Sequence, residues 1–247
     1  MNLALPMPRV VVETERIIVV SKHAGWALNA NERGRHSGYF HHIKSVLLDD
    51  RPGIDLFPCH RLDRCTSGCL LMAKDIETAR TVNQQFSAPS GRQDQRDRVH
   101  KTYVALSNRK PKKKMGRIVG DMEKSRRGSW KLSRQTTNPA VTTFESTSYL
   151  SACDDRRLYF FVVRPLTGRT HQIRVALKSV GAPILGDERY ANSTDASGYD
   201  RAYLHSATMS FKLPGDEKVD VICRPEEEDG MYFADEAFNG LWNESFP

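Results

Sequence analysis

A ten-residue stretch, residues 59–68, constrains this chain more than any other part of its sequence. It holds an aspartate, Asp63, between two arginines, and neighbouring positive charge keeps a carboxylate ionised. Thr, Ser and Gly at 66–68 favour a tight turn, and an apolar run at 69–73 is typical of a strand. The stretch predicts a turn that presents an ionised aspartate, which suits nucleophilic attack better than proton donation.

An arginine beside an aspartate is also common as a plain structural ion pair, so this stretch alone leaves both roles open. A second stretch, residues 166–174, mixes glycine, threonine and arginine in the same way ahead of an apolar segment. It runs on to the sequence GAPILGD at 181–187. Two such stretches in one chain favour a functional site.

Together these motifs resemble the RluA-like family of pseudouridine synthases. The resemblance covers about residues 9–211 and rests on four motifs: HRLDRCTSG at 60–68, KTY at 101–103, LTGRTHQIR at 166–174 and GAPILGDERY at 181–190. Three positions differ from the family's usual pattern: KHAG replaces KPAG at 22–25, Cys65 stands where an acidic residue is common, and LHS replaces LHA at 204–206. The differences concern the subgroup, because no group that the chemistry needs is missing.

The resemblance implies an enzyme that isomerises uridine to pseudouridine in tRNA or rRNA and needs no cofactor. It implies an α/β (α+β) fold with a long mixed, mostly antiparallel sheet, flanking helices and a central cleft. By the same resemblance Asp63 is the nucleophile, Tyr103 stacks on the target base, and Arg174 pairs with Asp63 and holds it ionised.

The two arginine-rich motifs also supply candidates for RNA contacts. Arg61 adjoins the nucleophile and either fills the space left by a flipped uridine or binds a phosphate. Further RNA-binding residues are expected at Arg64, Thr66, Arg169 and His171. Single histidines beside a motif are more often structural than catalytic, so His60, His171 and His205 are not assigned acid or base roles.

Positive charge is concentrated in residues 109–134. This segment holds eleven Lys or Arg against two acids, a net charge of +9, whereas the whole chain carries +7 with a pI near 9.2. Such a balance favours an anionic partner, and nucleic acid is the first candidate. We expect a mobile loop that lies along RNA phosphates, with Lys112, Lys113 and Lys114 among its contacts; a solvated loop without a partner is the alternative.

Periodicity predicts the secondary structure around these motifs. Runs rich in β-branched and aromatic residues predict strands at 9–13, 16–22, 69–73, 101–106, 141–149, 158–163, 202–211 and 219–222. Helical spacing of apolar residues predicts helices at 36–50, 75–86 and 171–180. Residues 87–100 are polar and contain Pro and Gly, which predicts a flexible loop.

One catalytic domain over residues 1–247 is the simplest organisation, since no repeat or linker is visible. Residues 215–247 hold ten acids against two bases, but five large apolar residues there predict a docked terminal helix. Residues 212–247 are therefore an acidic extension of the family core, and no separate S4-like domain is expected before Arg9.

Five cysteines without paired spacing predict reduced thiols and no metal site. The sequence shows no secretory signal and no apolar run of membrane-spanning length. We expect a cytoplasmic monomer that binds RNA, no membrane and no nucleotide cofactor.

Two other functions are compatible with parts of this pattern. A retaining glycosidase would need a second carboxylate about 5 Å from Asp63. The arginine-rich motifs at 60–68 and 166–174 hold no acid besides Asp63, and Asp187 lies some way beyond them. An RNA-binding protein without activity would not need the full set of Asp63, Tyr103 and Arg174.

Overall fold

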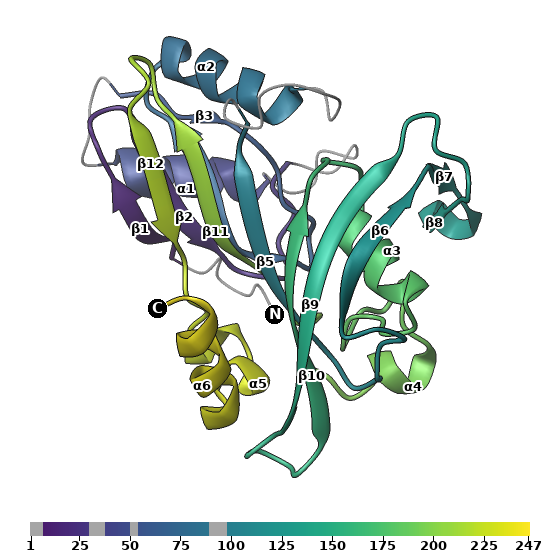
Figure 1. Cartoon of the computed structure of the whole chain (residues 1–247). Helices are drawn as coiled ribbons and strands as arrows, with labels where there is room; N and C mark the ends of the chain where they lie inside the picture. Colours follow the sequence, from purple (N-terminus) through teal and green to yellow (C-terminus); the bar gives the residue numbers. More distant parts are fainter. Residues whose placement is uncertain (1–6, 30–37, 50–53, 89–97) are drawn as a thin grey trace. The chain divides into compact units, whose positions relative to one another are not determined.

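The computed structural model describes four stretches of the chain: residues 7–29, 38–49, 54–88 and 98–247. Contacts within the chain gather them into two units. Unit 1 comprises residues 1–100 and 207–224, and unit 2 comprises residues 101–206 and 225–247. Figure 1 labels the helices and strands of both units.

Unit 1 is built on antiparallel strands flanked by two helices. Its strands are β1 (Arg9–Glu13), β2 (Ile17–Lys22), β3 (Phe57–Pro58), β4 (Ser67–Ala73), most of β11 (Leu204–Lys212) and β12 (Lys218–Ile222). Its helices are α1 (Tyr39–Leu48) and α2 (Ile76–Ser87). β2 lies between β1 and β4, β3 pairs with β4, and β11 pairs with β12, all antiparallel.

Strands β2 and β4 are buried on both faces, which explains their unbroken apolar sequences. Successive side chains of a strand point to opposite faces. One core cluster joins one face to α2 and includes Ile17, Val19, Leu71, Ala79 and Val82. The other cluster joins the opposite face to α1 and includes Ile18, Val20, Leu70, Tyr39 and Ile43.

The predicted start of helix α2 is confirmed. Asp75 caps the helix, because its carboxylate accepts a hydrogen bond of 2.7 Å from the backbone N–H of Thr78. Ala79 and Val82 of the predicted apolar stripe are buried, whereas Ile76 is 50% exposed. The buried stripe therefore begins one turn later than the spacing suggested.

A buried lysine ties β2 to the segment that precedes β4. The Nζ of Lys22 donates hydrogen bonds to the carbonyl oxygens of His23 at 2.7 Å, Thr66 at 2.9 Å and Arg64 at 3.4 Å. The side chain is fully buried. Because an ammonium group is costly to bury without partners, these carbonyls are part of what makes its position tolerable.

Unit 2 contains four paired strands, a separate hairpin and several helices. The strands are β5 (His100–Ser107), β6 (Met115–Gly120), β7 (Met122–Lys124), β8 (Trp130–Leu132), β9 (Ala140–Leu150) and β10 (Arg157–Pro165). The helices are α3 (Gln172–Ser179), α4 (Ser193–Ala196), α5 (Met231–Ala234) and α6 (Glu236–Ser245), with short 3-10 turns at Arg126–Gly128 and Glu227–Asp229. β5, β10, β9 and β6 pair in that order, antiparallel throughout.

The predicted hairpin of unit 2 is confirmed in β9 and β10. Phe160 and Phe161 follow each other on β10 and therefore face opposite ways: Phe160 contacts Phe238 of α6, and Phe161 contacts Phe144 of β9. The acidic C-terminal segment is docked as expected, since Phe238 and Trp242 are buried.

The basic segment 109–134 is not the loop that its composition suggested. It forms β6, which pairs with β9, and then the hairpin of β7 and β8. We call residues 122–132 the basic arm. Gly120 allows the backbone of Ser133 to approach closely, because a Cβ atom at position 120 would lie 2.2 Å from the carbonyl oxygen of Ser133. Lysine and glycine do not favour strands, so the composition did not predict these elements. Their stability comes from pairing with neighbouring strands.

The remaining predictions of secondary structure differ from the structure mainly at element ends. The helix predicted at 36–50 is α1 over its described part, and the flexible loop predicted at 87–100 falls largely on residues 89–97, outside the described residues. Ser67 and Gly68, predicted to lie in a turn, already belong to β4.

Replacing Lys22 by Met tests its structural role. The Met side chain fills a similar volume but leaves buried carbonyl oxygens without their cationic donor. Because hydrogen bonds to charged groups contribute about 1.5 to 3 kcal/mol each, we expect the free energy of unfolding to fall by about 3 kcal/mol in urea denaturation. Lys44→Met is the control, since Lys44 forms an exposed ion pair with Asp55 and should cost about 1 kcal/mol or less. Equal losses in the two variants would contradict the assignment.

Candidate functional site

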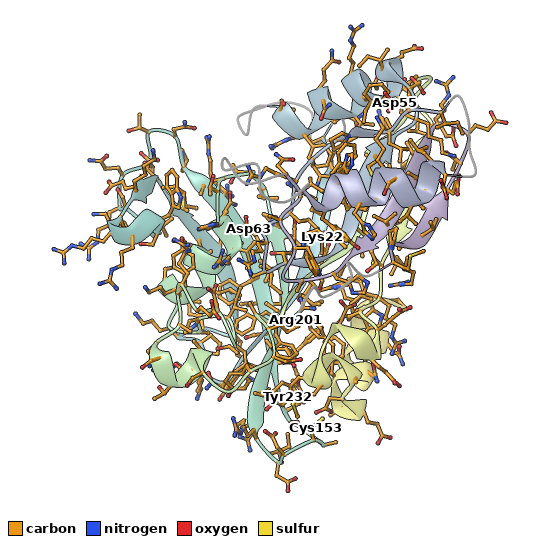
Figure 2. The ribbon with its side chains drawn as sticks, turned by 180° about the vertical axis from the view of Figure 1, so that it is seen from behind. Lys22, Asp55, Asp63, Cys153, Arg201 and Tyr232 are labelled. Carbon is orange, nitrogen blue, oxygen red and sulfur yellow. The ribbon has the colours of Figure 1, made fainter. Side chains whose placement is uncertain are left out.

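Asp63 lies at the first position of a hydrogen-bonded turn in unit 1. The backbone N–H of Thr66 donates to the carbonyl oxygen of Asp63 at 3.0 Å, which closes the turn. Figure 2 labels Asp63 together with Lys22, whose ammonium binds two carbonyls of this turn. The side chain of Asp63 is half-buried. The carboxylate therefore projects from a turn whose backbone is hydrogen-bonded to a buried ammonium group.

A second set of hydrogen bonds joins the same turn to Gly25. The Nε of Arg64 donates to the carbonyl oxygen of Gly25 at 2.8 Å, and the N–H of Gly25 donates back to the carbonyl oxygen of Arg64 at 2.8 Å. Arg61 and Arg64 are exposed, whereas Thr66 is buried. The two arginines therefore offer charge at the surface, and Thr66 contributes to the shape of the turn.

His60 has a structural role in the motif, in agreement with its sequence interpretation. Its Nε2 accepts a hydrogen bond of 3.0 Å from the backbone N–H of Leu71, so this nitrogen carries no proton. The ring also stacks on Phe86 of α2 with 4.9 Å between centroids. His205 is fully buried against Phe233 and Trp242.

The cysteines near the motif are free thiols, as expected. Burial raises the pKa of the Cys59 thiol to about 12. The hydrogen bond with Cys223, together with burial, raises the pKa of the Cys69 thiol. Thiolates are the form that binds metal, so these protonated thiols are poor ligands. No metal-binding group of His, Cys, Asp or Glu occurs among the described residues.

Tyr103 lies on β5 in unit 2, opposite Val163 of β10. It is 9% exposed. A buried ring on a paired strand has little freedom to move, which is the property that base stacking requires.

The motif 166–174 forms a loop and the first turn of α3, and one buried glutamine fastens it to β9. The side-chain oxygen of Gln172 accepts from the Thr167 hydroxyl at 2.6 Å and from the Arg169 N–H at 2.9 Å. Its amide nitrogen donates to the Val141 carbonyl and the Thr142 hydroxyl, both at 3.0 Å. The amide group has four partners, so the loop holds one conformation. Gln172 belongs to the motif LTGRTHQIR, but no role was predicted for it from the sequence.

Arg174, in the first turn of α3, forms a buried bidentate ion pair with Asp187. Its Nε lies 2.7 Å from Oδ2, and its Nη2 lies 2.8 Å from Oδ1. Arg174 is 7% exposed and Asp187 is 1% exposed. The sequence interpretation gave Arg174 a different partner, Asp63. That pairing joins residues of the two units and stays a prediction, whereas the pair with Asp187 lies within unit 2.

Tyr190 packs against the same arginine. The guanidinium carbon of Arg174 lies 4.9 Å from the centre of the Tyr190 ring. The Tyr190 hydroxyl lies 2.7 Å from Nδ1 of His171 and accepts the backbone N–H of Trp130 at 3.0 Å. Burial raises the pKa of Tyr190, so the hydroxyl keeps its proton. Tyr190 belongs to the motif GAPILGDERY, but no role was predicted for it from the sequence.

His171 occupies a left-handed backbone conformation, with φ 55° and ψ 20°, directly before α3. Such a conformation is rare for a residue other than glycine and concentrates at functional sites. The side chain is half-buried. Arg169 is exposed, and its guanidinium binds the side-chain oxygen of Asn138.

The lysine run is exposed but has a fixed backbone. Lys112, Lys113 and Lys114 all expose their side chains. The N–H of Lys112 donates to the Val180 carbonyl at 2.9 Å, and the carbonyl of Lys114 accepts from both the N–H and the hydroxyl of Ser146 at 2.7 Å. The three charges therefore project from an ordered segment next to the end of α3.

Within the described residues, no helix is long and apolar enough to cross a membrane.

Comparison with known proteins identifies the family. A model of the RNA pseudouridylate synthase family matches residues 16–179. An uncharacterized RNA pseudouridine synthase of Haemophilus influenzae is 45% identical over 168 residues, 68% of this chain and 68% of that protein. Ribosomal large subunit pseudouridine synthase C of Rickettsia conorii is 30% identical over 209 residues, 82% of this chain and 63% of that protein. The chain thus spans about two thirds of the length of these relatives.

Solved structures show the same fold. The human RNA pseudouridylate synthase domain containing 1 protein aligns with a TM-score of 0.69 at 22% identity, over 92% of this chain and 86% of that one. The human domain containing 4 protein aligns with a TM-score of 0.68 at 20% identity, over 90% of each chain. The predicted α+β class, a mostly antiparallel sheet with flanking helices, is confirmed.

The sequence motifs, the family match over more than half of the chain and the 45% identity to a relative agree with one another. This chain belongs to the RNA pseudouridylate synthase family, enzymes that isomerise uridine in RNA.

Proposed function

We propose that this chain converts uridine to pseudouridine in ribosomal RNA, with Asp63 as the nucleophile. The observation that supports this role most directly is that two sets of hydrogen bonds fix the turn that carries Asp63. The buried ammonium of Lys22 binds carbonyl oxygens of the turn, and Arg64 of the turn binds the carbonyl oxygen of Gly25. These contacts fix the backbone from which the carboxylate projects, as a nucleophile that must meet one substrate atom requires.

The reaction is an isomerisation that breaks one bond and forms another. The N1–C1′ bond of the nucleotide breaks, the uracil turns within the site, a C5–C1′ bond forms, and the proton on C5 is lost while N1 gains one. A carboxylate nucleophile divides this exchange into easier steps through a covalent intermediate. Attack of Asp63 on C1′ of the ribose and attack on C6 of the base are both compatible with this advantage.

Tyr103 and Arg174 complete the proposed catalytic set. Tyr103 stacks on the target base from β5 and assists removal of the C5 proton. Arg174 pairs with the Asp63 carboxylate and keeps it ionised, which is the usual effect of an adjacent guanidinium. Asp187 supports this role because it fixes two of the guanidinium nitrogens.

The same ion pair argues against a glycosidase. A retaining glycosidase needs a second carboxylate about 5 Å from the nucleophile. Asp187 was the candidate from the sequence, and both of its oxygens bind Arg174. A carboxylate in that state is a poor general acid.

RNA binding is assigned to exposed positive charge. Lys112, Lys113 and Lys114 are exposed on an ordered backbone, and Arg61, Arg64 and Arg169 are exposed in the motifs. We assign phosphate contacts to these six residues. His171 and Thr66 line the substrate site in this proposal, His171 through its ring and Thr66 through the shape of the turn.

Ribosomal RNA is favoured over tRNA by the names of the relatives. Several relatives, including those of Rickettsia conorii and Escherichia coli, are named ribosomal large subunit pseudouridine synthase C. The proposal retains the expectations that the enzyme is a cytoplasmic monomer and uses no cofactor. Large-subunit rRNA and tRNA, each labelled with tritium at C5 of uridine, distinguish the two substrates; release of tritium from tRNA alone would contradict the assignment to rRNA.

Replacing Asp63 by Asn tests the nucleophile. Asparagine keeps the shape but has no negative charge, so folding and RNA affinity should remain near the wild type. Tritium release should fall more than about a thousandfold, because the variant loses the step that the nucleophile makes possible. Asp220→Asn, an exposed change on β12 of the same unit, should retain full activity. Several per cent of wild-type turnover in Asp63→Asn would exclude Asp63 as the nucleophile.

Two replacements separate the roles of Tyr103. Tyr103→Phe keeps the ring and should retain RNA binding while slowing turnover. Tyr103→Ala removes the ring and should weaken capture of the base by about 1 to 3 kcal/mol, the usual contribution of one base stack. Tyr149→Phe is a matched control, since Tyr149 is also 9% exposed and its hydroxyl has no hydrogen-bond partner within the described residues. Full turnover in Tyr103→Phe would exclude the hydroxyl from proton transfer.

The lysine run is tested by the salt dependence of binding. Changing Lys112, Lys113 and Lys114 to Ala should flatten the plot of log affinity against log salt by up to about 0.7 per lost phosphate contact on single-stranded RNA. The control variant changes three exposed basic residues of unit 1 to Ala, namely Arg16, Arg80 and Lys218. Because both variants lose three charges, equal slopes would mean that net charge, rather than the lysine run, drives binding.

A further inference from the structure

The ring of Tyr190 covers one face of helix α3. Three side chains of that face contact it: the imidazole of His171 edge-on with 5.6 Å between centroids, the Arg174 guanidinium at 4.9 Å and the Lys178 ammonium at 5.7 Å. Residues three, four and seven positions apart share a helix face. Tyr190 is 3% exposed, so its ring is a fixed support for that face.

The hydroxyl of Tyr190 joins this face to the basic arm. The backbone N–H of Trp130, on β8 of the arm, donates to it at 3.0 Å. Nδ1 of His171 lies 2.7 Å from the same oxygen. A backbone N–H can only donate, and in the arrangement proposed here the phenol directs its single proton to Nδ1. Neutral His171 then carries its own proton on Nε2.

The loop that carries Tyr190 also holds the arginine and the arm. Asp187 Oδ1 binds Arg174 and accepts the backbone N–H of Arg189 at 3.0 Å and of Tyr190 at 3.2 Å. The Nη1 of Arg189 donates to the carbonyl oxygen of Arg127, at the tip of the arm, at 2.8 Å. Residues 187–190 thus contact both α3 and the arm.

We propose that Tyr190 is a positioning residue for pseudouridine formation. Its ring holds Arg174 in the orientation that Asp187 selects, and its hydroxyl sets the tautomer of His171 and anchors the arm. This inference rests on the proposed function, in which Arg174 serves the nucleophile and basic residues bind RNA.

The two roles belong to different parts of one side chain, so two variants separate them. Tyr190→Phe retains the ring and loses the hydroxyl. The arm loses one anchor and His171 its partner, so KM for RNA should rise about three- to tenfold, the effect of one hydrogen bond, with kcat near the wild type. Tyr190→Leu loses the ring beside Arg174, so kcat should fall about tenfold, as loss of a buried cation–π contact allows.

Tyr149→Phe and Tyr149→Leu are the matched controls. Tyr149 is a buried tyrosine of the same unit, on β9, and contributes nothing to the proposed site. Thermal unfolding of all four variants identifies losses that come from folding alone. If the folded Tyr190 variants show wild-type kcat and KM, Tyr190 has only a structural role and the inference is wrong.

A spectroscopic measurement tests the inference without turnover. The ¹⁵N chemical shifts of the His171 imidazole, assigned with His171→Asn, report which nitrogen is protonated. Asparagine suits this position because it tolerates the left-handed conformation. We expect the Nε2–H tautomer in the wild type and a mixture of tautomers in Tyr190→Phe. An Nδ1–H tautomer in the wild type would overturn the inference.

The turnover and tautomer measurements test the proposed function and the further inference separately. If the wild type releases no tritium from either RNA, the proposed function is wrong, while the histidine tautomer still decides the geometry assigned to Tyr190. If the wild type is active and the Tyr190 variants match it, only the inference is wrong.

Discussion

The buried ion pair between Arg174 and Asp187 is the interaction on which the site in unit 2 depends. Both side chains are more than nine-tenths buried and meet through two parallel hydrogen bonds. Removal of one partner from such a pair typically costs about 3 to 5 kcal/mol, because the other charge is left buried alone. The fold can therefore hold the arginine only with the loop 187–190 in place.

The need to pair this buried charge explains how α3, the loop 187–190 and the basic arm are held together. The Asp187 carboxylate binds two backbone N–H groups of its own loop besides the arginine, so the loop is shaped around the charge. Tyr190 then lies against α3, and its hydroxyl and Arg189 reach the basic arm. The arm, rich in charge and poor in apolar residues, acquires its order from these contacts rather than from a core of its own.

Unit 1 solves a similar problem with backbone carbonyls. The Lys22 ammonium is fully buried, and the turn that begins at Asp63 supplies two of its acceptors. Burial of a charge again enforces one conformation, since any other leaves the ammonium or the carbonyls without partners. In both units a charged group inside the protein orders a loop that presents another charged group nearer the surface.

The sequence by itself determined where most of the elements lie and which family the chain belongs to. Unbroken apolar runs located β2 and β4, which are buried on both faces. Runs of aromatic and β-branched residues located the β9–β10 hairpin, and apolar spacing with a period of 3.6 located α2 and α3. The motifs around Asp63, Tyr103 and Arg174 indicated the family, since such side-chain sets are set by chemistry and are written in short runs. Only the tertiary structure decided the partners. Arg174 and Asp187 are 13 positions apart, Lys22 and Thr66 of the turn are 44 apart, and Tyr190 and Trp130 of the arm are 60 apart. No local pattern in the sequence encodes contacts over such separations. The strands of the basic segment were missed for the same reason, because their stability lies in hydrogen bonds to β9 and to each other. The secondary-structure propensity of a residue depends on its neighbours along the chain. The pairing of strands and the partners of buried charges depend on residues that are neighbours only in the folded structure.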